Sequence, residues 1–452
     1  MEREKLGSRM GFILLSAGCA IGIGNVWRFP YITGLYGGSA FVLFYLFFLF
    51  TMGIPVMTME FAVGRASRRS IIKSFTKLER PGAKWHLHGY LGMAGNYLLM
   101  MFYTTVAGWM LYYFYQMLTG RFTGKSPEQV GAMFQDMLSE PLVLTVSMVV
   151  VVAAGILICS MGLQKGVERI TKIMMSLLLV IIVVLAVHGL TLEGSMEGVK
   201  FYLLPDFQRM KQVGIWETVT AAMNQAFFTL SLGIGSMAIF GSYIDKKRTL
   251  LGEAVNIAVL DTFVALVSGL IIFPTCFAFG ISPDAGPQLI FVTLPNVFNS
   301  MAGGRIWGTL FFVFMTFAAF STILAVFENI ISCCMDLFHW SRKKACLVNL
   351  AALIVLSLPC VLGYNLWSAF QPLGEGSAVL DLEDFAVSNV ILPIGSLCYL
   401  LFCVTRYGWG FDHYLEETNT GTGLKMPKGL RFYLSYILPV LLVFLIVLGL
   451  AG

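Results

Sequence analysis

Long apolar runs separated by short polar segments dominate the chain. Eleven such runs lie near residues 11–36, 39–63, 90–118, 141–160, 167–188, 216–242, 253–280, 304–334, 344–362, 386–405 and 432–451. Most reach or approach the ~20 residues that cross a bilayer as a helix, whereas barrel strands would be shorter and alternating. Backbone groups in lipid must also be paired within their own segment. The pattern therefore predicts an all-α polytopic membrane protein.

The composition supports this prediction. Of the 452 residues, 57% are hydrophobic and 12% are charged, and a soluble domain carries about twice that charge. A water-soluble enzyme is therefore nearly excluded. Glycines and Arg28 interrupt the first apolar run, so we expect no cleaved secretory signal. The nine cysteines lie in or beside apolar runs, and we expect no disulfide framework.

The distribution of Lys and Arg predicts the orientation. With a cytoplasmic N-terminus, 23 basic residues fall in inside segments and 6 in outside segments, while Arg28 lies within a span. Cytoplasmic loops carry such an excess, so we expect the N-terminus inside and the C-terminus outside. The densest basic stretch, residues 65–84, is then an orientation signal and not a nucleic-acid or anionic-lipid patch. We expect membrane lipid but no nucleic acid as a partner, and these patterns leave the oligomeric state open.

One short sequence pattern occurs in both halves of the chain. The first span contains Gly22 and Gly24 within IGIGN, and the sixth contains Gly233 and Gly235 within LGIGS. These spans cross the bilayer in opposite directions because they are five spans apart. Glycine-interrupted spans at corresponding places in two halves indicate the central site of a transporter. Alternatively, the glycines only permit close helix packing.

Several ionisable side chains fall within the predicted spans. They are Arg28, Glu60, Asp261, Glu328 and, at an outer end, Asp384. Such residues are costly in a membrane and are functional candidates by default. Pro30 and the glycines before it would free backbone carbonyls in mid-membrane, where they must line a cavity or bind an ion.

Oxygen donors near mid-span predict a site for a hard monovalent cation such as Na⁺. They are Asn25, Thr229, Asp261, Ser321 and Thr322. Na⁺ takes oxygen ligands by the same logic as other hard ions. The hydroxyls of Ser321 and Thr322 have an alternative role, because such groups commonly bond a carbonyl of their own helix. Helix N-termini exposed at a break favour an anionic group, so a substrate carboxylate is the natural guest.

Three segments carry a specific combination of residues: GIGNVWRFP (22–30), GIPVMTMEFAVGR (53–65) and NQAFFTLSLGIGS (224–236). Together they resemble the bacterial members of the neurotransmitter:sodium symporter family, which have the LeuT-type fold. The resemblance implies one transporter domain over 1–452, with eleven transmembrane helices of which helices 1 and 6 are broken at mid-membrane. It also implies a 5+5 inverted repeat, with spans 1–5 in 1–188, spans 6–10 in 216–405 and span 11 in 430–452. The expected location is the bacterial inner membrane.

The same resemblance implies two sodium sites. The first would comprise the Ala20 carbonyl with Asn25, Thr229 and Asp261, completed by the substrate carboxylate. The second would comprise the carbonyls of Gly18, Ile21 and Ala318 and the hydroxyls of Ser321 and Thr322. If the substrate is itself a sodium ligand, substrate and sodium raise each other's affinity by the same factor.

The resemblance further implies a substrate pocket. Its residues would be Ala20, Gly22, Gly24, Leu99, Tyr103, Phe228, Thr229, Ser231, Ile234, Thr322 and Val326. The Tyr103 hydroxyl would bind the substrate carboxylate, although an interfacial or packing role in the aromatic run 102–115 is the alternative. Monoamine-transporting members have an aspartate where this chain has Gly22. We therefore expect a neutral hydrophobic or aromatic L-amino acid with its α-carboxylate intact.

Two gates are expected on the same basis. The outer gate would comprise an ion pair and an aromatic lid, formed by Arg28 and Asp384 with Tyr103 and Phe228. The inner gate would comprise Arg3, Ser242, Tyr243 and Asp336. Exposed ion pairs contribute ~0–1 kcal/mol, which suits contacts that open in every cycle. Glu60 is expected to be structural, binding amides of the broken sixth span.

Asp261 also bears on the ions used. Chloride-dependent relatives have a neutral asparagine at this position, and a chloride ion supplies the negative charge. Here the carboxylate itself can supply that charge, with Tyr45, Gln225 and Ser231 around it by analogy. Burial favours the protonated carboxyl, whereas a bound cation favours the carboxylate. We therefore hypothesise chloride-independent transport with proton counter-transport on the return step.

Two other functions remain open from the sequence. A proton-coupled or exchanging amino-acid carrier of the same fold would lack sodium dependence. A membrane-embedded enzyme would need a reactive constellation, and the chain contains neither a His-Glu-x-x-His nor a Gly-x-Ser-x-Gly motif. We therefore expect a transporter and not an enzyme.

Overall fold

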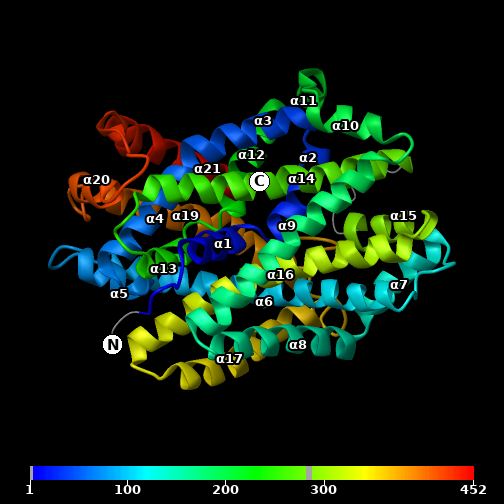
Figure 1. Cartoon of the computed structure of the whole chain (residues 1–452), viewed down its shortest axis with the longest axis horizontal. Coiled ribbons are helices and arrows are strands. Elements are labelled where there is room, and N and C mark those ends of the chain that lie inside the picture. Colours follow the sequence, from blue (N-terminus) through cyan, green and yellow to red (C-terminus); the bar gives the residue numbers. More distant parts are fainter. Residues whose placement is uncertain (1–3, 281–287, 452) are drawn as a thin grey trace.

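The computed structural model describes residues 4–280 and 288–451, and the regular elements of these residues are helices (Figure 1). Those of the first half are α1 (Arg9–Ala20), α2 (Phe29–Leu35), α3 (Ser39–Phe48), α4 (Ile54–Ser67), α5 (Ile71–Leu78), α6 (His86–Leu118), α7 (Pro127–Ser139), α8 (Pro141–Ser160), α9 (Arg169–Leu190), α10 (Ser195–Leu203) and α11 (Phe207–Val213). Those of the second half are α12 (Ile215–Thr229), α13 (Ser236–Tyr243), α14 (Leu250–Ala278), α15 (Leu294–Ser300), α16 (Gly304–Phe338), α17 (Arg342–Leu362), α18 (Val379–Phe385), α19 (Leu392–Val404), α20 (Phe411–Asn419) and α21 (Leu438–Ala451).

The helices that could cross a membrane coincide with the predicted apolar runs. Within the described residues, eight are long and apolar enough by themselves: Ser39–Ser67, Pro141–Ser160, Leu163–Leu190, Leu250–Ala278, Gly304–Phe338, Arg342–Leu362, Val379–Val404 and Lys428–Leu450. The pair α1 and α2 qualifies as one further span, bent by 55°. The remaining two runs, 90–118 and 216–242, correspond to α6 and to α12 with α13. The all-helical prediction is confirmed, and the number of eleven crossings stays a prediction.

The first span is interrupted beside its glycines. α1 ends at Ala20, Ile21 adopts an extended conformation with ψ 95°, and a π-helical turn that leads into α2 begins at Gly24. A Cβ atom on Gly22 would overlap the hydroxyls of Tyr103 and Thr322. Glycine at this position therefore leaves room for two side chains to approach the backbone closely.

The sixth predicted span is interrupted in the same manner. α12 ends at Thr229 and α13 begins at Ser236, and between them Gly233 adopts a φ of 95°. This conformation favours glycine, and a Cβ atom there would also overlap the carbonyl oxygen of Leu392. Glu60 of α4 is fully buried and accepts a hydrogen bond from the Gly233 amide at 2.5 Å. It thereby pairs a donor that the break leaves outside a helix, which confirms the structural role expected for Glu60.

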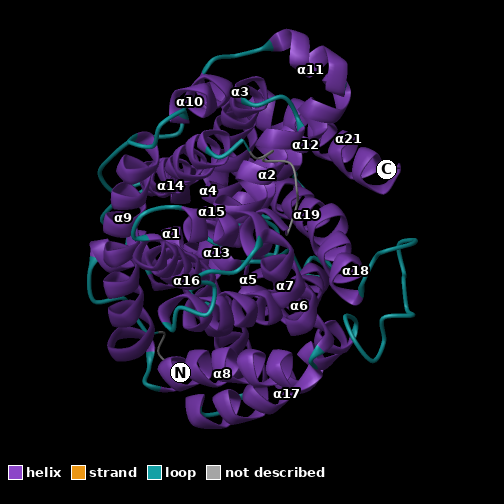
Figure 2. Ribbon diagram, turned by 90° about the vertical axis from the view of Figure 1, so that its right-hand side faces the viewer, coloured by secondary structure: helices purple, strands orange, loops and turns teal. Residues whose placement is uncertain are grey.

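The interior of the bundle contains the helices that carry most candidate residues. The spans that include α4, α14 and α16 are mostly buried, whereas less than half of each span that includes α8, α17 or α21 is buried. In Figure 2, α1, α13 and α16 lie toward the middle, and α8 and α17 lie along one margin. The exposed side chains of the marginal spans are largely apolar, as a lipid-facing surface requires.

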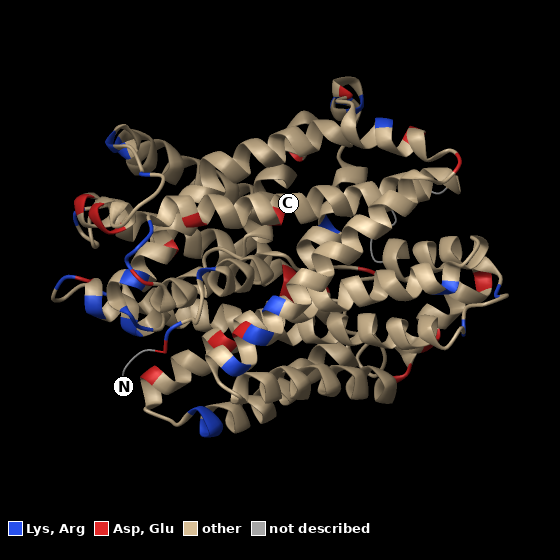
Figure 3. Ribbon diagram, in the orientation of Figure 1, with Lys and Arg blue, Asp and Glu red and all other residues tan. Residues whose placement is uncertain are grey.

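Basic side chains gather at one end of the bundle. Lys and Arg are concentrated around α5 and at the start of the last span, Lys428–Leu450, and few lie near α7, α10 and α15 at the other end (Figures 1 and 3). The stretch 65–84 belongs to the basic end. This asymmetry agrees with the orientation expected from the sequence, so we name it the predicted cytoplasmic end.

Candidate substrate and sodium site

The two helix breaks meet inside the bundle. Ser231, in the second break, donates a hydrogen bond to the carbonyl of Cys19 at 3.2 Å. The hydroxyl of Tyr103 on α6 accepts a hydrogen bond from the Ile23 amide at 2.8 Å. Asn96, also on α6, donates to the carbonyl beside Gly235, that of Ile234, at 2.8 Å. Backbone groups of both broken helices therefore face side chains of an unbroken one.

One group of oxygen atoms joins α16 to the first break. Ser321 donates to the Ile21 carbonyl at 3.3 Å and to the Ala318 carbonyl of its own helix at 2.9 Å. Thr322 lies 3.2 Å from the Gly18 carbonyl oxygen and 3.5 Å from that of Ile21. The Ser321 hydroxyl thus bonds a carbonyl of its own helix, as in the alternative role, and also faces a carbonyl of the first break, whereas its role as a sodium ligand stays a prediction. Carbonyl and hydroxyl oxygens facing one another form a neutral donor set of the kind that Na⁺ accepts.

A second group of oxygen atoms surrounds a carboxylate on α14. Asp261 is fully buried, and its Oδ1 accepts a hydrogen bond from the Asn25 side-chain amide at 2.8 Å. Thr229, the last residue of α12, donates to Oδ2 at 3.1 Å. In the described part of the chain, the side-chain hydrogen bonds to this carboxylate come from neutral groups. A buried carboxylate needs a compensating cation or a proton, so this set fits Na⁺.

A small cavity lies between the two breaks. It is lined by Cys19, Ala20, Gly22, Gly24, Leu99, Tyr103, Phe228, Ser231, Ile234, Thr322 and Leu392. Cys19 and Leu392 were not predicted, and two residues expected in the pocket, Thr229 and Val326, are not part of the lining. Thr229 instead contacts Asp261, and Val326 is buried one helical turn beyond Thr322. The lining combines three hydroxyls with aromatic and aliphatic side chains, which suits an amphiphilic guest.

A wider vestibule opens toward the end opposite the predicted cytoplasmic end. Its volume is about 820 Å³, and Arg28 and Asp384 line it. Tyr103 and Phe228 line both the vestibule and the small cavity. These two rings therefore stand between the two spaces, where an aromatic lid would have to lie.

The ion pair expected above this lid is long, and a serine bridges its two members. The Arg28 guanidinium lies 3.8 Å from Asp384 Oδ1, and Ser388 bridges the two residues. The Ser388 hydroxyl accepts from Arg28 at 3.1 Å and donates to Asp384 at 2.7 Å. The guanidinium also lies 4.1 Å from the ring centroid of Phe228, so the pair and the lid are in contact.

The residues expected at the inner gate lie near the predicted cytoplasmic end. Tyr243 donates to the Glu328 carboxylate at 2.7 Å, and Ser242 donates to the Ile239 carbonyl at 2.6 Å. Asp336 accepts a hydrogen bond from the Ser70 amide at 2.7 Å. Arg3, the fourth expected residue, lies outside the described residues. The inner gate therefore stays a prediction.

Glu328 has a cationic partner that had no assigned role in the sequence. Arg342, at the start of α17, donates to both carboxylate oxygens, at 2.7 and 3.0 Å. This bidentate pair ties α17 to α16, and Tyr243 joins it through its hydroxyl. In the sequence, Arg342 was counted only among the basic residues of the predicted inside segments. Its pairing with Glu328 was not predicted, because the two residues are fourteen positions apart and no spacing rule joins them.

The residues expected around Asp261 by analogy are divided between two places. Gln225 donates to the Gly24 carbonyl at 3.1 Å, and Tyr45 is fully buried. Ser231 instead contacts Cys19 and lines the small cavity. It is therefore placed to meet a substrate directly.

Comparison with known proteins identifies the family. The model of the sodium:neurotransmitter symporter family matches residues 3–130 and 126–451. The chain belongs to this family. It is 35% identical over 395 residues to YhdH, an uncharacterized sodium-dependent transporter of Bacillus subtilis, over 87% of this chain and 86% of YhdH. It is 31% identical over 458 residues to an uncharacterized sodium-dependent transporter of Methanocaldococcus jannaschii, over 98% and 89% of the two chains.

A solved structure is similar over the whole length of this symporter. The crystal structure of MhsT in complex with L-phenylalanine has a TM-score of 0.88 and 37% sequence identity, over 98% of this chain and 99% of MhsT. This likeness confirms the expected LeuT-type fold. The chain is thus a sodium-dependent symporter with a multi-pass membrane fold, and its relatives are transporters and not enzymes.

Three residues of this symporter join the site without having been predicted there. Cys19 could have been found, because it lies between two expected sodium-site carbonyls, those of Gly18 and Ala20. Leu392 and Ser388 could not, because they follow the second break by about 150 residues and reach the site only through tertiary packing.

Proposed function

We propose that this symporter couples Na⁺ influx to the uptake of a neutral hydrophobic or aromatic L-amino acid by alternating access. The observation that carries the proposal is the small cavity between two helix breaks, with a buried carboxylate on α14 next to it. Membership of a sodium-dependent family supports the choice of Na⁺. In the proposed cycle the cavity also has an inward-facing state, in which its cytoplasmic side opens after its outer side closes.

Two positions are proposed for Na⁺, which is itself transported. The first uses the Ala20 carbonyl, Asn25, Thr229 and Asp261, and the hydrogen bonds that join these side chains support it. The second uses the carbonyls of Gly18, Ile21 and Ala318 with the hydroxyls of Ser321 and Thr322, and the contacts between α16 and the first break support it. α1 and α12 both end at the breaks, so their C-terminal carbonyls add a favourable field for cations.

The amino acid is proposed to lie with its carboxylate toward the first sodium position. Tyr103 and the amides after Ile21 would bind this carboxylate, and the carboxylate would complete the ligands of Na⁺. Coupling follows, because a ligand shared by two bound species raises the affinity of each for the other.

The side chain of the substrate is proposed to be uncharged and apolar. Leu99, Phe228 and Ile234 line the cavity, and the described lining residues include no ionisable group that could balance a charged substrate side chain. Gly22 leaves room for the carboxylate, because a Cβ atom there would reach the Tyr103 and Thr322 hydroxyls. MhsT binds L-phenylalanine in its crystal structure, which supports this substrate class.

Asp261 is proposed to make transport independent of chloride. Its carboxylate supplies the fixed negative charge beside the first sodium position. After sodium and substrate leave, a proton on this buried group would remove the unpaired charge and return outward with it. A purely proton-coupled or exchanging carrier, left open by the sequence, is disfavoured by the sodium-dependent relatives.

Uptake into proteoliposomes tests this function. Radiolabelled L-phenylalanine should accumulate when an inward Na⁺ gradient is applied, and should equilibrate without accumulation when choline replaces Na⁺. Replacing chloride by gluconate should leave the rate unchanged. Accumulation driven by a proton gradient in the absence of Na⁺ would contradict sodium coupling, and loss of uptake in gluconate would contradict chloride independence.

A further inference from the structure

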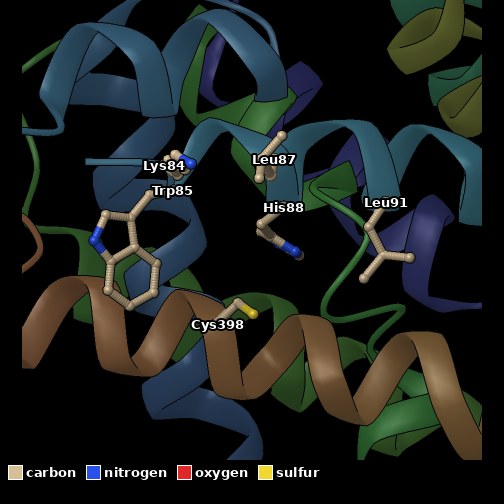
Figure 4. A pocket seen from close by; sticks show the side chains of 6 residues that line it. All are labelled: Lys84, Trp85, Leu87, His88, Leu91 and Cys398. Carbon is tan, nitrogen blue, oxygen red and sulfur yellow. The ribbon is translucent and has the colours of Figure 1, made fainter. Parts of the chain in front are cut away.

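A second pocket lies away from the transport pathway, between the start of α6 and the helix α19. It has a volume of about 470 Å³ and is lined by Lys84, Trp85, Leu87, His88, Leu91 and Cys398 (Figure 4). None of these residues lines the substrate cavity or the vestibule. The pocket lies at the predicted cytoplasmic end, because α6 begins directly after the basic stretch 65–84.

His88 is the polar group inside this pocket. Its side chain points into the pocket from α6, above Cys398 on α19 (Figure 4). The residue is only 6% exposed, and among the described residues neither ring nitrogen has a hydrogen-bond partner. Phe75 and Tyr399 pack edge-on against the ring at 5.1 Å and offer it no polar contact. Buried polar groups are normally paired, so an imidazole N–H aimed into a pocket points to a ligand with an acceptor oxygen.

The mouth of the pocket is cationic and aromatic. Lys84 is exposed, and in the part of the chain that the structure describes no carboxylate pairs with it. Trp85 donates its indole N–H to the Tyr407 carbonyl at 3.0 Å, which fixes the ring beside the pocket. Tryptophan is enriched at the level of lipid headgroups, and a free ammonium group there favours an anionic headgroup.

The rest of the pocket lining on α6 is apolar and exposed. Leu87 is 55% exposed, and Leu91 is 38% exposed. Leu91 follows Leu87 by four residues on α6, which places it about 6 Å further along the helix axis. The pocket lining therefore combines a cation, an aromatic ring and a hydrogen-bond donor with an aliphatic face. This combination matches a phosphate headgroup followed by an acyl chain.

We propose that this pocket binds one anionic phospholipid of the cytoplasmic leaflet. The headgroup phosphate lies between the Lys84 ammonium group and a ring N–H of His88, and an acyl chain lies along Leu87 and Leu91. The lipid pairs the buried imidazole and covers the apolar side of α6. It is a structural and modulatory ligand, separate from the substrate and from Na⁺.

Native mass spectrometry of the purified full-length protein with defined lipids tests the proposal. The wild type should retain one phosphatidylglycerol in preference to phosphatidylcholine. Lys84→Gln should weaken phosphatidylglycerol binding about fivefold, the effect of one basic residue near the membrane surface, and His88→Phe should weaken it further. Lys428→Gln removes an exposed charge from the same predicted end without touching the pocket and should bind like the wild type. Lys84 is exposed, so its variant should fold, as an unchanged melting temperature would show.

Four results would overturn the proposal. Unchanged phosphatidylglycerol binding in both pocket variants would show that this pocket is not the lipid-binding site. Equal retention of phosphatidylcholine would remove the role of Lys84 in charge recognition. Displacement of the lipid by millimolar inorganic phosphate would show that the pocket recognises phosphate alone. A change only in the monomer to dimer ratio of the variants would assign the surface to a second copy of the chain.

Discussion

At the scale of single residues, the proposed chemistry depends on an aspartate and a glycine. Among the described residues, the side chains that donate hydrogen bonds to the Asp261 carboxyl group are neutral, and the proposal gives this group a negative charge when sodium is bound. Gly22 leaves open the space between Tyr103 and Thr322 that a larger residue would fill. Each can be tested by one conservative substitution, because Asp261→Asn removes the charge and Gly22→Ala adds one methyl group.

Asp261→Asn should make transport dependent on chloride. The amide keeps the shape of the side chain and its oxygen donor, but it removes the negative charge beside the first sodium position. Uptake of L-phenylalanine should then fall severalfold when gluconate replaces chloride, whereas the wild type should be unaffected. An internal pH dye should also report loss of proton counter-transport.

The exposed Asp136 provides a matched control, since Asp136→Asn removes the same charge far from the site. Equal chloride sensitivity of wild type, Asp136→Asn and Asp261→Asn would mean that Asp261 does not replace the anion.

Gly22→Ala should weaken substrate binding more than it affects folding. The added methyl group overlaps the hydroxyls of Tyr103 and Thr322, and overpacking of this kind typically costs about 1–3 kcal/mol. The KM for L-phenylalanine should rise roughly tenfold to a hundredfold. Gly429→Ala is a suitable control, because a Cβ atom there meets no neighbour within 4 Å. A KM equal to that of the wild type would show that this space is not used by the substrate.

At the scale of elements, the two broken helices depend on different physical causes. At the first break, Gly22 is needed for the approach of side chains from α6 and α16. At the second, Gly233 is needed for its backbone conformation and for the approach of α19. Glu60 then binds the amide that the second break leaves free. The two similar glycine pairs in the sequence therefore correspond to two different local structures at the helix breaks.

Gly233→Ala should destabilise the second break. Alanine at a φ of 95° is strained by about 1–3 kcal/mol, and its Cβ atom would also meet the Leu392 carbonyl. The melting temperature in detergent should fall by several degrees, and Na⁺-dependent uptake should fall with it. Gly252→Ala, on α14, places its Cβ atom at ordinary contact distances and should retain stability. Wild-type stability of Gly233→Ala would mean that this turn adjusts easily.

The sequence predicted the elements better than the contacts between them. Apolar run lengths located the spans because a bilayer requires a minimum helix length, and glycine positions located both breaks. Most of the lining of the cavity followed from the family motifs around these breaks. Leu392 and Ser388 escaped prediction because the segment from α18 to α19 reaches the site only by packing. The partner of Glu328 escaped because the connection between α16 and α17 brings Arg342 back to it.

At the scale of the whole molecule, a vestibule lies in the half opposite the predicted cytoplasmic end, and a buried ion pair lies nearer that end. The vestibule ends at Tyr103 and Phe228, above the small cavity. Below it, the pair of Glu328 with Arg342 links α16 to α17. The proposed cycle requires these two halves to open in turn, which the division into inverted repeats over 1–188 and 216–405, still a prediction, would allow.

Sodium and substrate should each raise the affinity of the other by one common factor. The reason is that the substrate carboxylate is proposed as a ligand of the first sodium ion, and coupling between two binding sites is reciprocal. Binding of tritiated L-phenylalanine measured across Na⁺ concentrations, and of ²²Na⁺ across L-phenylalanine concentrations, should give the same factor, typically about 5–150-fold.

L-Phenylalaninamide isolates the cause of this coupling, because it keeps the side chain and the amine but lacks the carboxylate. It should compete weakly for the cavity and should leave the affinity for ²²Na⁺ unchanged even when it is saturating. If the amide raised sodium affinity as strongly as the amino acid does, the coupling would have to arise from closure of the molecule around any bound guest. Direct contact between the carboxylate and the cation would then no longer explain symport. If the amino acid raises the affinity for Na⁺ and the amide does not, the coupling depends on that single contact.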